Sequence, residues 1–529
     1  MNNDRLNSLN YQLKIYKEKY SALSLEYSTK MKQMEGIIKK EVNLKTKELK
    51  EEHKTEIAEY KNIIKDKDAQ IEALKKELAK KQYLLDNNSY NSGIPTSKTG
   101  IGEKKYIPNT RVKTDKNVGG QKGHKKHKLN KFSESEATQI EEVTCDECSK
   151  CNCSDIEVLQ TSIDKYEIDY DVQLVKKINR FREYKCKKCG CVFHAKIPND
   201  LKEECQYGKT VQSMALCLTN EIYTPFNKTV KLISGLTNEQ INLSEGYVVK
   251  LQKRAYDKLE NFESELTEHF PKQYVYGWDD GVISINTKEG CFRVYCTDNV
   301  TLFKAHEKKN IDGIKKDGIL NNTTNNTTVM HDHLKHNYND DYDYKNVECV
   351  IHLIRRLRKM NEITHHKWEV DLNTLLSETI HKRNSYYDNN NNLTGYFSNN
   401  EIVDIKKRFD DIISFGMEEY KKSNGYCKEE LTLLEDLKKY KSNYLLWLDD
   451  SKLPTTNNNS ERSIRPIKSK MKISGQFKNL EYAKYYARIR SYIETCKRNG
   501  INIIDACVRL LNNNPYKLKE IIEIKPSNY

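Results

Sequence analysis

The chain has 529 residues and a formal net charge of +14, and 31% of its residues are charged. This length suffices for roughly three or four domains, and the positive balance favours a polyanionic partner. No apolar run is long enough to span a bilayer and the first residues are polar, so we expect neither a membrane span nor a signal peptide. Fifteen cysteines in such a chain favour reduced thiols and metal sites over a disulfide scaffold.

Residues 1–86 are highly charged and free of proline, which is the composition of a long helix. Apolar residues recur every seven positions, first at Leu6, Leu13, Tyr20, Tyr27 and Met34 and then, in a shifted phase, at Ile57, Ile64, Ile71, Leu78 and Leu85. A sustained apolar heptad predicts a coiled coil, and the change of phase predicts a stutter or a bend. We expect the partner helix to come from a second copy, which predicts a homo-oligomer. The alternative is one solvated helix lying on its own protein.

Residues 87–135 are rich in Ser, Asn, Gly, Lys and His, so they are predicted to form a basic flexible linker. Its basic cluster could lie along a phosphate backbone and comprises Lys122, His124, Lys125 and Lys126. A solvated linker without a ligand is the alternative.

Two Cys-x-x-Cys pairs stand in residues 136–200, Cys145 with Cys148 and Cys186 with Cys189. Four thiolates at this spacing predict a structural Zn²⁺ site, and the alternating residues 156–184 between the pairs predict the hairpin of a zinc ribbon. Other cysteines nearby are spare candidates for ligands, namely Cys151, Cys153 and Cys191.

Residues 201–270 are predicted to be helical. A short helix, a polar turn and a basic helix carrying Lys250, Lys253 and Arg254 could form a helix-turn-helix that enters a DNA groove. An equally good interpretation is a helical bracket packed on the next domain.

The pattern of residues 271–362 predicts three antiparallel strands, a helix, a strand, a further strand and a basic helix. The expected segments are Tyr274–Trp278, Val282–Asn286, Cys291–Cys296, Lys304–Ile314, Thr327–His331, Val347–Ile351 and Leu353–Met360. This order is that of a ribonuclease-H-like domain. In that arrangement Asp279 ends the first strand and Asp332 follows the fourth, which are neighbours in the sheet.

The interval between Asp332 and Glu461 is too long for a simple connection, so residues 363–450 are predicted to be a helical insertion. Residues 451–500 then complete the core and 501–529 form a helical tail. Glu461 is expected in a helix beside basic residues suited to phosphates, namely Arg462, Arg465, Lys468, Lys470 and Lys472. Cys349-x-x-His352 is interpreted as a buried packing pair.

Three carboxylates gathered by such a fold would repel one another unless cations neutralise them. Two Mg²⁺ or Mn²⁺ ions held by Asp279, Asp332 and Glu461 would relieve the repulsion and bracket a phosphodiester. Each acid taken alone is more simply a strand end or a helix cap, so only the set is informative.

Several segments together resemble the insertion-sequence-66 family of DDE transposases of bacterial and archaeal mobile elements. The similarity extends from about residue 84 almost to the end, through the linker, GGQKGHKKH, the paired Cys-x-x-Cys motifs, WDDGVISIN, VMHDHLKHNY, ECVIHLIRRL, NNNSERSIRP and SYIETCKRNGIN. The resemblance implies catalytic roles for Asp279, Asp332 and Glu461. Asp280 stands where the family has Glu and Gly281 where it has Thr, which makes Asp280 a second candidate ligand.

The sequence thus predicts a multidomain α+β transposase that binds the terminal inverted repeats of its element, cleaves the ends by metal-activated hydrolysis and joins the 3′-OH to target DNA. Its expected partner is double-stranded DNA and its expected location is the cytoplasm, associated with the nucleoid. The sequence leaves accessory proteins open as partners. The alternative is a catalytically decayed descendant that binds DNA or regulates.

Overall fold

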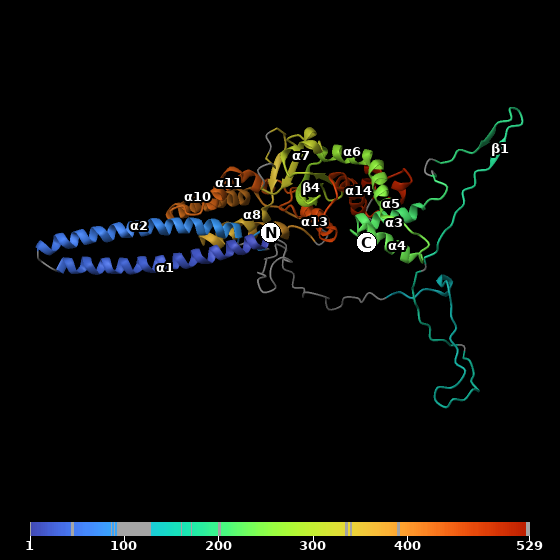
Figure 1. The fold of residues 1–529 in the computed structure, drawn as a ribbon, viewed down its shortest axis with the longest axis horizontal. Coiled ribbons are helices and arrows are strands. Elements are labelled where there is room, and N and C mark those ends of the chain that lie inside the picture. The colour runs from blue at the N-terminus through green and yellow to red at the C-terminus, as the bar shows by residue number, and fades with distance from the viewer. Residues whose placement is uncertain are drawn as a thin grey trace. The chain divides into compact units, whose positions relative to one another are not determined.

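The computed structural model describes the chain apart from residues 1, 44–46, 86, 89, 93–128, 160, 171, 199–200, 202, 334–336, 339–340, 389–391 and 525–529. It divides into two compact units. The main unit comprises Met1–Val112, Glu203–Val230 and Ser244–Tyr529, and the small unit comprises Lys113–Lys202 and Lys231–Leu243. The chain is an α+β protein with an N-terminal helical region and a mixed sheet in its C-terminal part (Figure 1).

The N-terminal region consists of two long helices, α1 (Asn2–Asn43) and α2 (Lys47–Leu85), which lie side by side and antiparallel (Figure 1). The direction follows from their cross-contacts, since Lys81 Nζ donates to Gln12 Oε1 at 2.8 Å while Lys67 pairs with Glu26 at 3.8 Å. The partner helix that the heptad requires is therefore present within the same chain, and these contacts do not need a second copy.

The two phases of the heptad belong to these two helices. Leu13 is buried at 7% exposure, and Tyr16, Tyr20, Ile64 and Ile71 are half-buried along the facing sides. The expected stutter or bend coincides with the end of one helix and the start of the next, and residues 44–46 between them lie outside the described residues.

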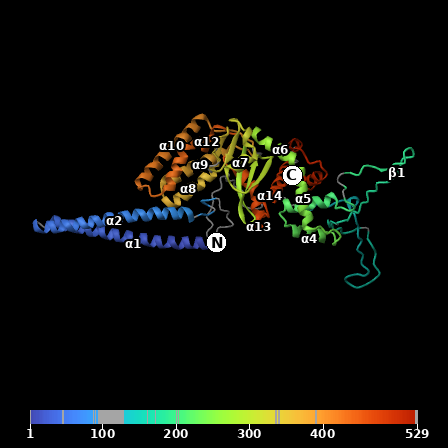
Figure 2. The ribbon, with the colours of Figure 1, turned by 45° about the horizontal axis from the view of Figure 1, so that its top comes forward.

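A five-stranded sheet has the order β5-β4-β3-β6-β7. Strand β3 pairs antiparallel with β4, and β4 with β5, whereas β6 is parallel to both β3 and β7. The bounds are β3 Val275–Ile285, β4 Lys288–Cys296, β5 Thr301–His306, β6 Thr328–His331 and β7 Lys345–Glu348. The sheet lies between helices α8–α12 on one side and helices α6 and α14 on the other (Figure 2), whose bounds are given below.

The prediction of two short strands at Tyr274–Trp278 and Val282–Asn286 was wrong, because both belong to the single strand β3. Asp279 therefore lies inside a strand rather than at its end. The third of the three antiparallel strands is β5, whose last residues fall in the predicted helix Lys304–Ile314. The helix α7 begins later, at Ile311, and ends at Asp317. The strand predicted at Thr327–His331 corresponds to β6. The strand predicted at Val347–Ile351 corresponds to β7, which begins two residues and ends three residues earlier than expected.

Helices surround the sheet within the main unit. The helices that precede it in the sequence are α3 Lys209–Asn220, α4 Phe226–Leu236, α5 Glu245–Lys258 and α6 Glu260–His269. The last part of α4 belongs to the small unit. Short 3₁₀ helices are η3 Phe270–Lys272 and η4 Leu320–Asn322. After β7 come α8 Val350–Thr364, α9 Lys367–Ser385, α10 Asn399–Lys422, α11 Lys428–Lys439 and α12 Lys441–Asp449. The last helices are α13 Asn458–Ser474, α14 Leu480–Arg498, α15 Ile503–Leu511 and α16 Leu518–Glu523.

Helices α8–α12 bury one continuous apolar core that includes Trp368 and Trp447, both at 0% exposure. A second core forms between the sheet, α13 and α14 around Phe292, Ile464 and Tyr486. The first core also takes in Met330 of β6 and Val347 of β7, and the second holds α13 against the sheet. None of the described helices is both long and apolar enough to cross a membrane.

The small unit contains β1 Glu183–Lys185 paired with β2 Val192–His194, and the 3₁₀ helix η2 Glu134–Glu136. The hairpin expected at residues 156–184 is absent from the described part of that segment, and the observed hairpin instead encloses Cys186 and Cys189. Alternation predicts a strand only where one face is covered, and here apolar side chains such as Val158, Ile163 and Val175 are exposed.

The charges of Asp280 and Arg293 are neutralised inside the sheet. Arg293 is 1% exposed, and its guanidinium donates to Asp280 Oδ1 at 2.7 Å and to Asp317 Oδ2 at 3.1 Å. Tyr295 and His306 also bond to Asp317, at 2.8 Å each. This network explains how a strand tolerates an internal pair of acids.

We predict that Arg293→Met lowers the free energy of unfolding of the main unit by about 3–5 kcal/mol, because it removes the guanidinium that compensates two buried carboxylates, Asp280 and Asp317. Thermal and denaturant unfolding measure the effect. The matched control is Lys422→Met, which breaks an exposed pair with Glu418 and should change little. Equal effects of the two substitutions would contradict this account of the network.

Candidate active site

The first two acids lie at the same level of neighbouring parallel strands, Asp279 within β3 and Asp332 directly after the end of β6. Gly277 of β3 pairs with Met330 of β6. Asp279 and Asp332 each follow two residues later, and parallel strands are spaced by about 4.8 Å. Their side chains therefore leave the sheet on the same face, because residues two apart along a strand share a face.

The third acid, Glu461, comes from the first turn of α13, which packs on β3 and β4. The start of α13 is tied to β3 where Asn457 Nδ2 donates to the Trp278 carbonyl at 2.7 Å. The two elements approach so closely that a Cβ added to Gly277 would collide with Ser460 Oγ and lie 2.9 Å from Asn457 Oδ1. Glycine at 277 thus permits the approach that carries Glu461 to the acids of the strands.

The electrostatics of Asp279 show that the three acids act on one another. Its burial, the charge of Asp332 and the charge of Glu461 raise the pKa of Asp279 to about 7, against opposition from the Asp280 backbone N–H and from Lys468. A buried carboxylate whose pKa is raised by two neighbouring carboxylates belongs to a cluster of negative charge that suits divalent cations. Glu461 Oε1 is also buried without a hydrogen-bond partner among the described residues. Both observations fit the predicted Mg²⁺ or Mn²⁺ ligands.

Two histidines flank Asp332, and the sequence reasoning missed both. His331 Nε2 bonds to Asn346 Oδ1 at 2.7 Å, and its ring stacks on Trp278 with centroids 5.8 Å apart. Asn337 Nδ2 donates to Asp332 Oδ1 at 3.0 Å and orients that carboxylate. The signal in the sequence is the alternation His-Asp-His, which places both rings on the face opposite the acid.

His333 ties the end of β6 to the helices beyond it. It contacts Glu348 at 2.7 Å and Asp436 of α11 at 3.2 Å. Although burial opposes a charge there, the hydrogen bonds to Asp436 and Glu348 raise the pKa of His333 to about 9. The imidazolium therefore connects the strand that precedes Asp332 to the helices of residues 363–450.

Cys349 and His352 lie closer to the third acid than we predicted. Cys349 is buried and accepts the Asn457 N–H at 3.2 Å, as a packing residue would. His352 instead places Nε2 3.6 Å from Glu461 Oε1, and Cys349, His352 and Glu461 all present ligand atoms within 4.8 Å of one another. Burial opposes a charge on His352, yet Cys349 and Glu461 raise its pKa to about 9. His352 is thus a neighbour of the site.

Asp280, the second candidate ligand, is held by Arg293 through both carboxylate oxygens, at 2.7 and 3.2 Å. Successive side chains of a strand point to opposite faces, so Asp280 and Asp279 face opposite sides of the sheet. The arrangement favours Asp279 as the ligand.

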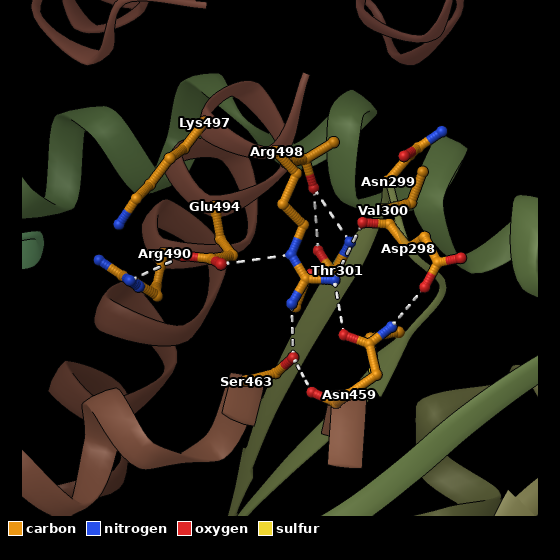
Figure 3. Close-up of polar contacts among 12 residues, drawn as sticks. Asp298, Asn299, Val300, Thr301, Asn459, Ser463, Arg490, Glu494, Lys497 and Arg498 are labelled. Carbon is orange, nitrogen blue, oxygen red and sulfur yellow. Dashed lines mark hydrogen bonds and ion pairs between the residues drawn. The ribbon is translucent and has the colours of Figure 1, made fainter. Parts of the chain in front are cut away.

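A hydrogen-bond network centred on Arg498 fixes the turn that carries Glu461 (Figure 3). From α14, Arg498 Nη2 donates to Ser463 Oγ at 2.6 Å and Nη1 to Asn459 Oδ1 at 3.3 Å. Nη1 also donates to the Thr297 carbonyl at 2.7 Å, and Glu494 accepts from Nε at 3.2 Å. Asn459 and Ser463 lie two positions before and after Glu461, so Arg498 determines where that turn sits relative to β4 and β5.

The basic residues predicted to contact DNA lie in three places. Arg462, Arg465 and Lys468 are exposed along α13 beside Glu461, and Lys472 is exposed further along that helix. Lys470 differs, because it is buried with its ammonium 4.8 Å from the centre of the Tyr486 ring, and burial lowers its pKa to about 8. The prediction that Lys470 grips phosphates was therefore wrong.

Helix α5 exposes Lys250, Lys253 and Arg254, of which Lys253 pairs with Asp257 at 2.9 Å. Its opposite face packs on α14 and α3 and buries Val248 and Leu251. These contacts agree with the interpretation of a helical bracket packed on the next domain. The basic face of α5 remains exposed to solvent. The linker residues Lys122, His124, Lys125 and Lys126 lie outside the described residues.

The cysteines of the small unit form two turns of the same design. Cys148 N–H donates to the Cys153 carbonyl at 2.9 Å, and Cys186 N–H donates to the Cys191 carbonyl at 2.8 Å. Asn152 and Gly190 occupy equivalent positions with φ of 54° and 75°. In this repeat Cys148 and Cys151 occupy the positions that Cys186 and Cys189 occupy in the second turn. Cys145 precedes the first turn and has no equivalent in the second. Hydrogen bonds from backbone N–H groups lower the pKa of Cys148 and of Cys186, as metal ligands require.

The predicted zinc ligands are not gathered into one site in the structure. Among the described residues, no group of three metal-binding side chains with ligand atoms within 4.8 Å of one another includes Cys145, Cys148, Cys186 or Cys189. The two turns are individually suited to a thiolate-bound metal, but their separation supplies no tetrahedral set.

The mixed sheet and the helix packed on it thus carry three acids, of which Asp332 and Glu461 act through their charges on the third, Asp279. The model of the Transposase IS66 family matches residues 204–485, and the chain belongs to that family. Membership implies a transposase role, DNA as a partner and a divalent metal ion as cofactor. No curated protein matches the chain.

We predict that Asp279→Asn stabilises the metal-free protein, and more so at pH 8 than at pH 5. The pKa of Asp279 in the folded state, about 7, lies above its ordinary value of 3.8, so the folded state binds this proton more tightly than the unfolded state does. The free energy of unfolding therefore falls as the pH rises from 3.8 to about 7. Asparagine removes this loss. Melting temperatures in chelator test the prediction, with Asp343→Asn, an exposed acid, as control. A stabilisation that does not grow with pH would contradict it.

We predict that Arg498→Met lowers the rate of DNA cleavage by up to roughly 100-fold while DNA binding is retained, because Glu461 moves with its turn. Lys497→Met is the matched control, since Lys497 lies next to Arg498 but contacts only Glu221 among the ion pairs described. Cleavage rates of the two variants at saturating DNA decide the question. A wild-type rate for a folded Arg498→Met protein would show that the network does not position Glu461.

Proposed function

We propose that the chain is a DDE transposase that binds the terminal inverted repeats of its mobile element, cleaves the ends by hydrolysis and joins the resulting 3′-OH to target DNA. The observation that supports this most directly is the mutual influence of Asp279, Asp332 and Glu461. Family membership supports the class of reaction, and the site supports the residues that perform it.

The strand order supports a ribonuclease-H-like core. Three antiparallel strands, β3 to β5, are followed by β6 and β7 in parallel on the other side of β3. In this order the central strand and its parallel neighbour each bring one acid to the same face. Helices α9–α12 then stand between β7 and α13 as an insertion, which the long interval in the sequence predicts.

Asp279, Asp332 and Glu461 would hold the divalent ions of the reaction. Two such ions, when bound, activate the attacking oxygen and stabilise the leaving oxygen of a phosphodiester. The chain's own residues hold this site rigid: Asn337 orients Asp332, Asn457 and Gly277 fix the approach of α13, and Arg498 fixes its first turn.

The exposed cations of α13 would hold the DNA backbone over the acids. Arg462, Arg465 and Lys468 lie within two turns of Glu461 on one helix. Their charge would attract phosphates without sequence preference. His352, next to Glu461, would restrict the position of that carboxylate through its imidazole.

Other modules would select the element ends. Lys250, Lys253 and Arg254 on α5 would contact DNA, as would the linker cluster at Lys122–Lys126. A structural Zn²⁺ in the small unit would require the two cysteine turns to come together, and Cys151 would then be a better-placed partner of Cys148 than Cys145. Homo-oligomers would use surfaces of the α1/α2 hairpin outside its internal seam.

We expect the purified full chain to cleave duplex DNA taken from the boundaries of its element in a Mg²⁺-dependent reaction. Asp279→Asn, Asp332→Asn and Glu461→Gln should each abolish cleavage and strand transfer while DNA binding persists, because each removes a carboxylate ligand. The control is Asp343→Asn, which changes an exposed acid that precedes β7 and should retain activity. Cleavage by Asp279→Asn at the wild-type rate would refute the assignment, and inactivity of the wild-type chain with intact DNA binding would favour the decayed alternative.

A further inference from the structure

A second cluster of metal-ligating side chains lies among the helices that follow the sheet. His366, Glu369 and Glu430 present ligand atoms that are all within 4.8 Å of one another. They come from the junction before α9, the first turn of α9 and the first turn of α11. None of the three takes part in the site of Asp279, Asp332 and Glu461.

The two carboxylates of this cluster are removed from solvent. Glu369 is 1% exposed and Glu430 is 0% exposed, while the His366 side chain keeps 13%. A buried carboxylate is costly unless a cation or a proton compensates it. Burial, aided by the charge of Glu430, raises the pKa of Glu369 to about 7. A third acid, Glu419, lies beside them and accepts the backbone N–H of Trp368 at 2.9 Å.

The hydrogen bonds in the cluster orient the carboxylates but leave one oxygen unpartnered. Glu430 Oε1 accepts from Trp368 Nε1 at 2.8 Å and lies 2.6 Å from His366 Nδ1. Glu369 accepts from Thr364 Oγ1 at 2.5 Å and from Asn361 Nδ2 at 3.1 Å. Glu430 Oε2 is buried and has no hydrogen-bond partner among the described residues. This arrangement of oriented carboxylates around an unpartnered oxygen is typical of a ligand set with its supporting hydrogen bonds.

We propose that His366, Glu369 and Glu430 bind a divalent first-row transition metal ion that ties the ends of α8, α9 and α11 together. One imidazole nitrogen and two carboxylates suit such an ion better than they suit Ca²⁺ or Mg²⁺, which prefer oxygen alone. Metal–ligand bonds of about 2.0–2.2 Å separate ligand atoms by roughly 3–4 Å, so the present spacing needs only small shifts. The ion would take the place of the direct contact between His366 Nδ1 and Glu430 Oε1.

A cavity provides access to the cluster. It has a volume of about 440 Å³, and its lining includes Glu369 together with Asn361, Glu362 and Asn373. A hydrated cation could therefore approach Glu369 from this cavity, whose lining also includes Arg358, Leu357 and Val370. The ion would be structural, because the nearest residues belong to helix ends of the insertion rather than to the acids of the sheet.

The experiment uses the full chain carrying Asp279→Asn and Asp332→Asn, which removes two ligands of the other candidate carboxylate site. The protein is stripped with chelator and titrated with Mn²⁺, and bound ion is counted by electron paramagnetic resonance. Mn²⁺ is chosen because thiolates of the small unit select softer metals. We expect one bound Mn²⁺ per chain and a higher melting temperature when it binds.

Adding Glu430→Gln or Glu369→Gln to this background should abolish that binding, whereas adding Glu435→Gln should preserve it. Glu435 is an exposed acid on the same helix as Glu430 and is the matched control. Circular dichroism verifies that each variant folds. If one of the two glutamine variants fails to fold, the other is sufficient for the test. Absence of bound Mn²⁺ in the background protein, or binding that survives in a folded Glu430→Gln or Glu369→Gln protein, would overturn the proposal.

Discussion

The close packing of α13 on β3 is the constraint on which the candidate active site depends. Glu461 reaches the acids of the sheet only because Gly277 has no side chain where Ser460 and Asn457 pass. The bond from Asn457 to the Trp278 carbonyl then fixes this approach at the residue next to Asp279. A strand and a helix separated by almost two hundred residues of sequence thus become one site through a contact between backbone and short side chains.

Support for the site is distributed over every element around it. Arg498 holds the first turn of α13 from the side of α14, and His333 connects the end of β6 to α11. Arg293 compensates Asp280 on the opposite face of β3. Each of these side chains either compensates the charge of a buried acid or forms a hydrogen bond that restricts the motion of the element carrying an acid. The acids at the centre repel one another, so the surrounding structure must hold them in place until cations bind.

The sequence predicted elements whose causes are local, and it was less reliable where distant partners decide. The strand at Thr327–His331 and the heptad of the first 85 residues follow from periodicity, and the structure contains them. The continuity of β3 through Asp279 and Asp280 could not be predicted, because Arg293 compensates the charge from another strand. The partner of the heptad and the position of His352 beside Glu461 also depend on tertiary packing, as does the burial of Lys470.

The central claim is that Asp279, Asp332 and Glu461 share the divalent ions of a phosphodiester reaction. The most direct measurement is anomalous diffraction from crystals of the full chain grown with Mn²⁺ and DNA from an element end. At these three acids the account predicts two manganese positions roughly 3.5–4 Å apart, with Asp279 coordinating and Asp332 and Glu461 completing the ligands. Manganese bound elsewhere, with none in contact with Asp279, would contradict it.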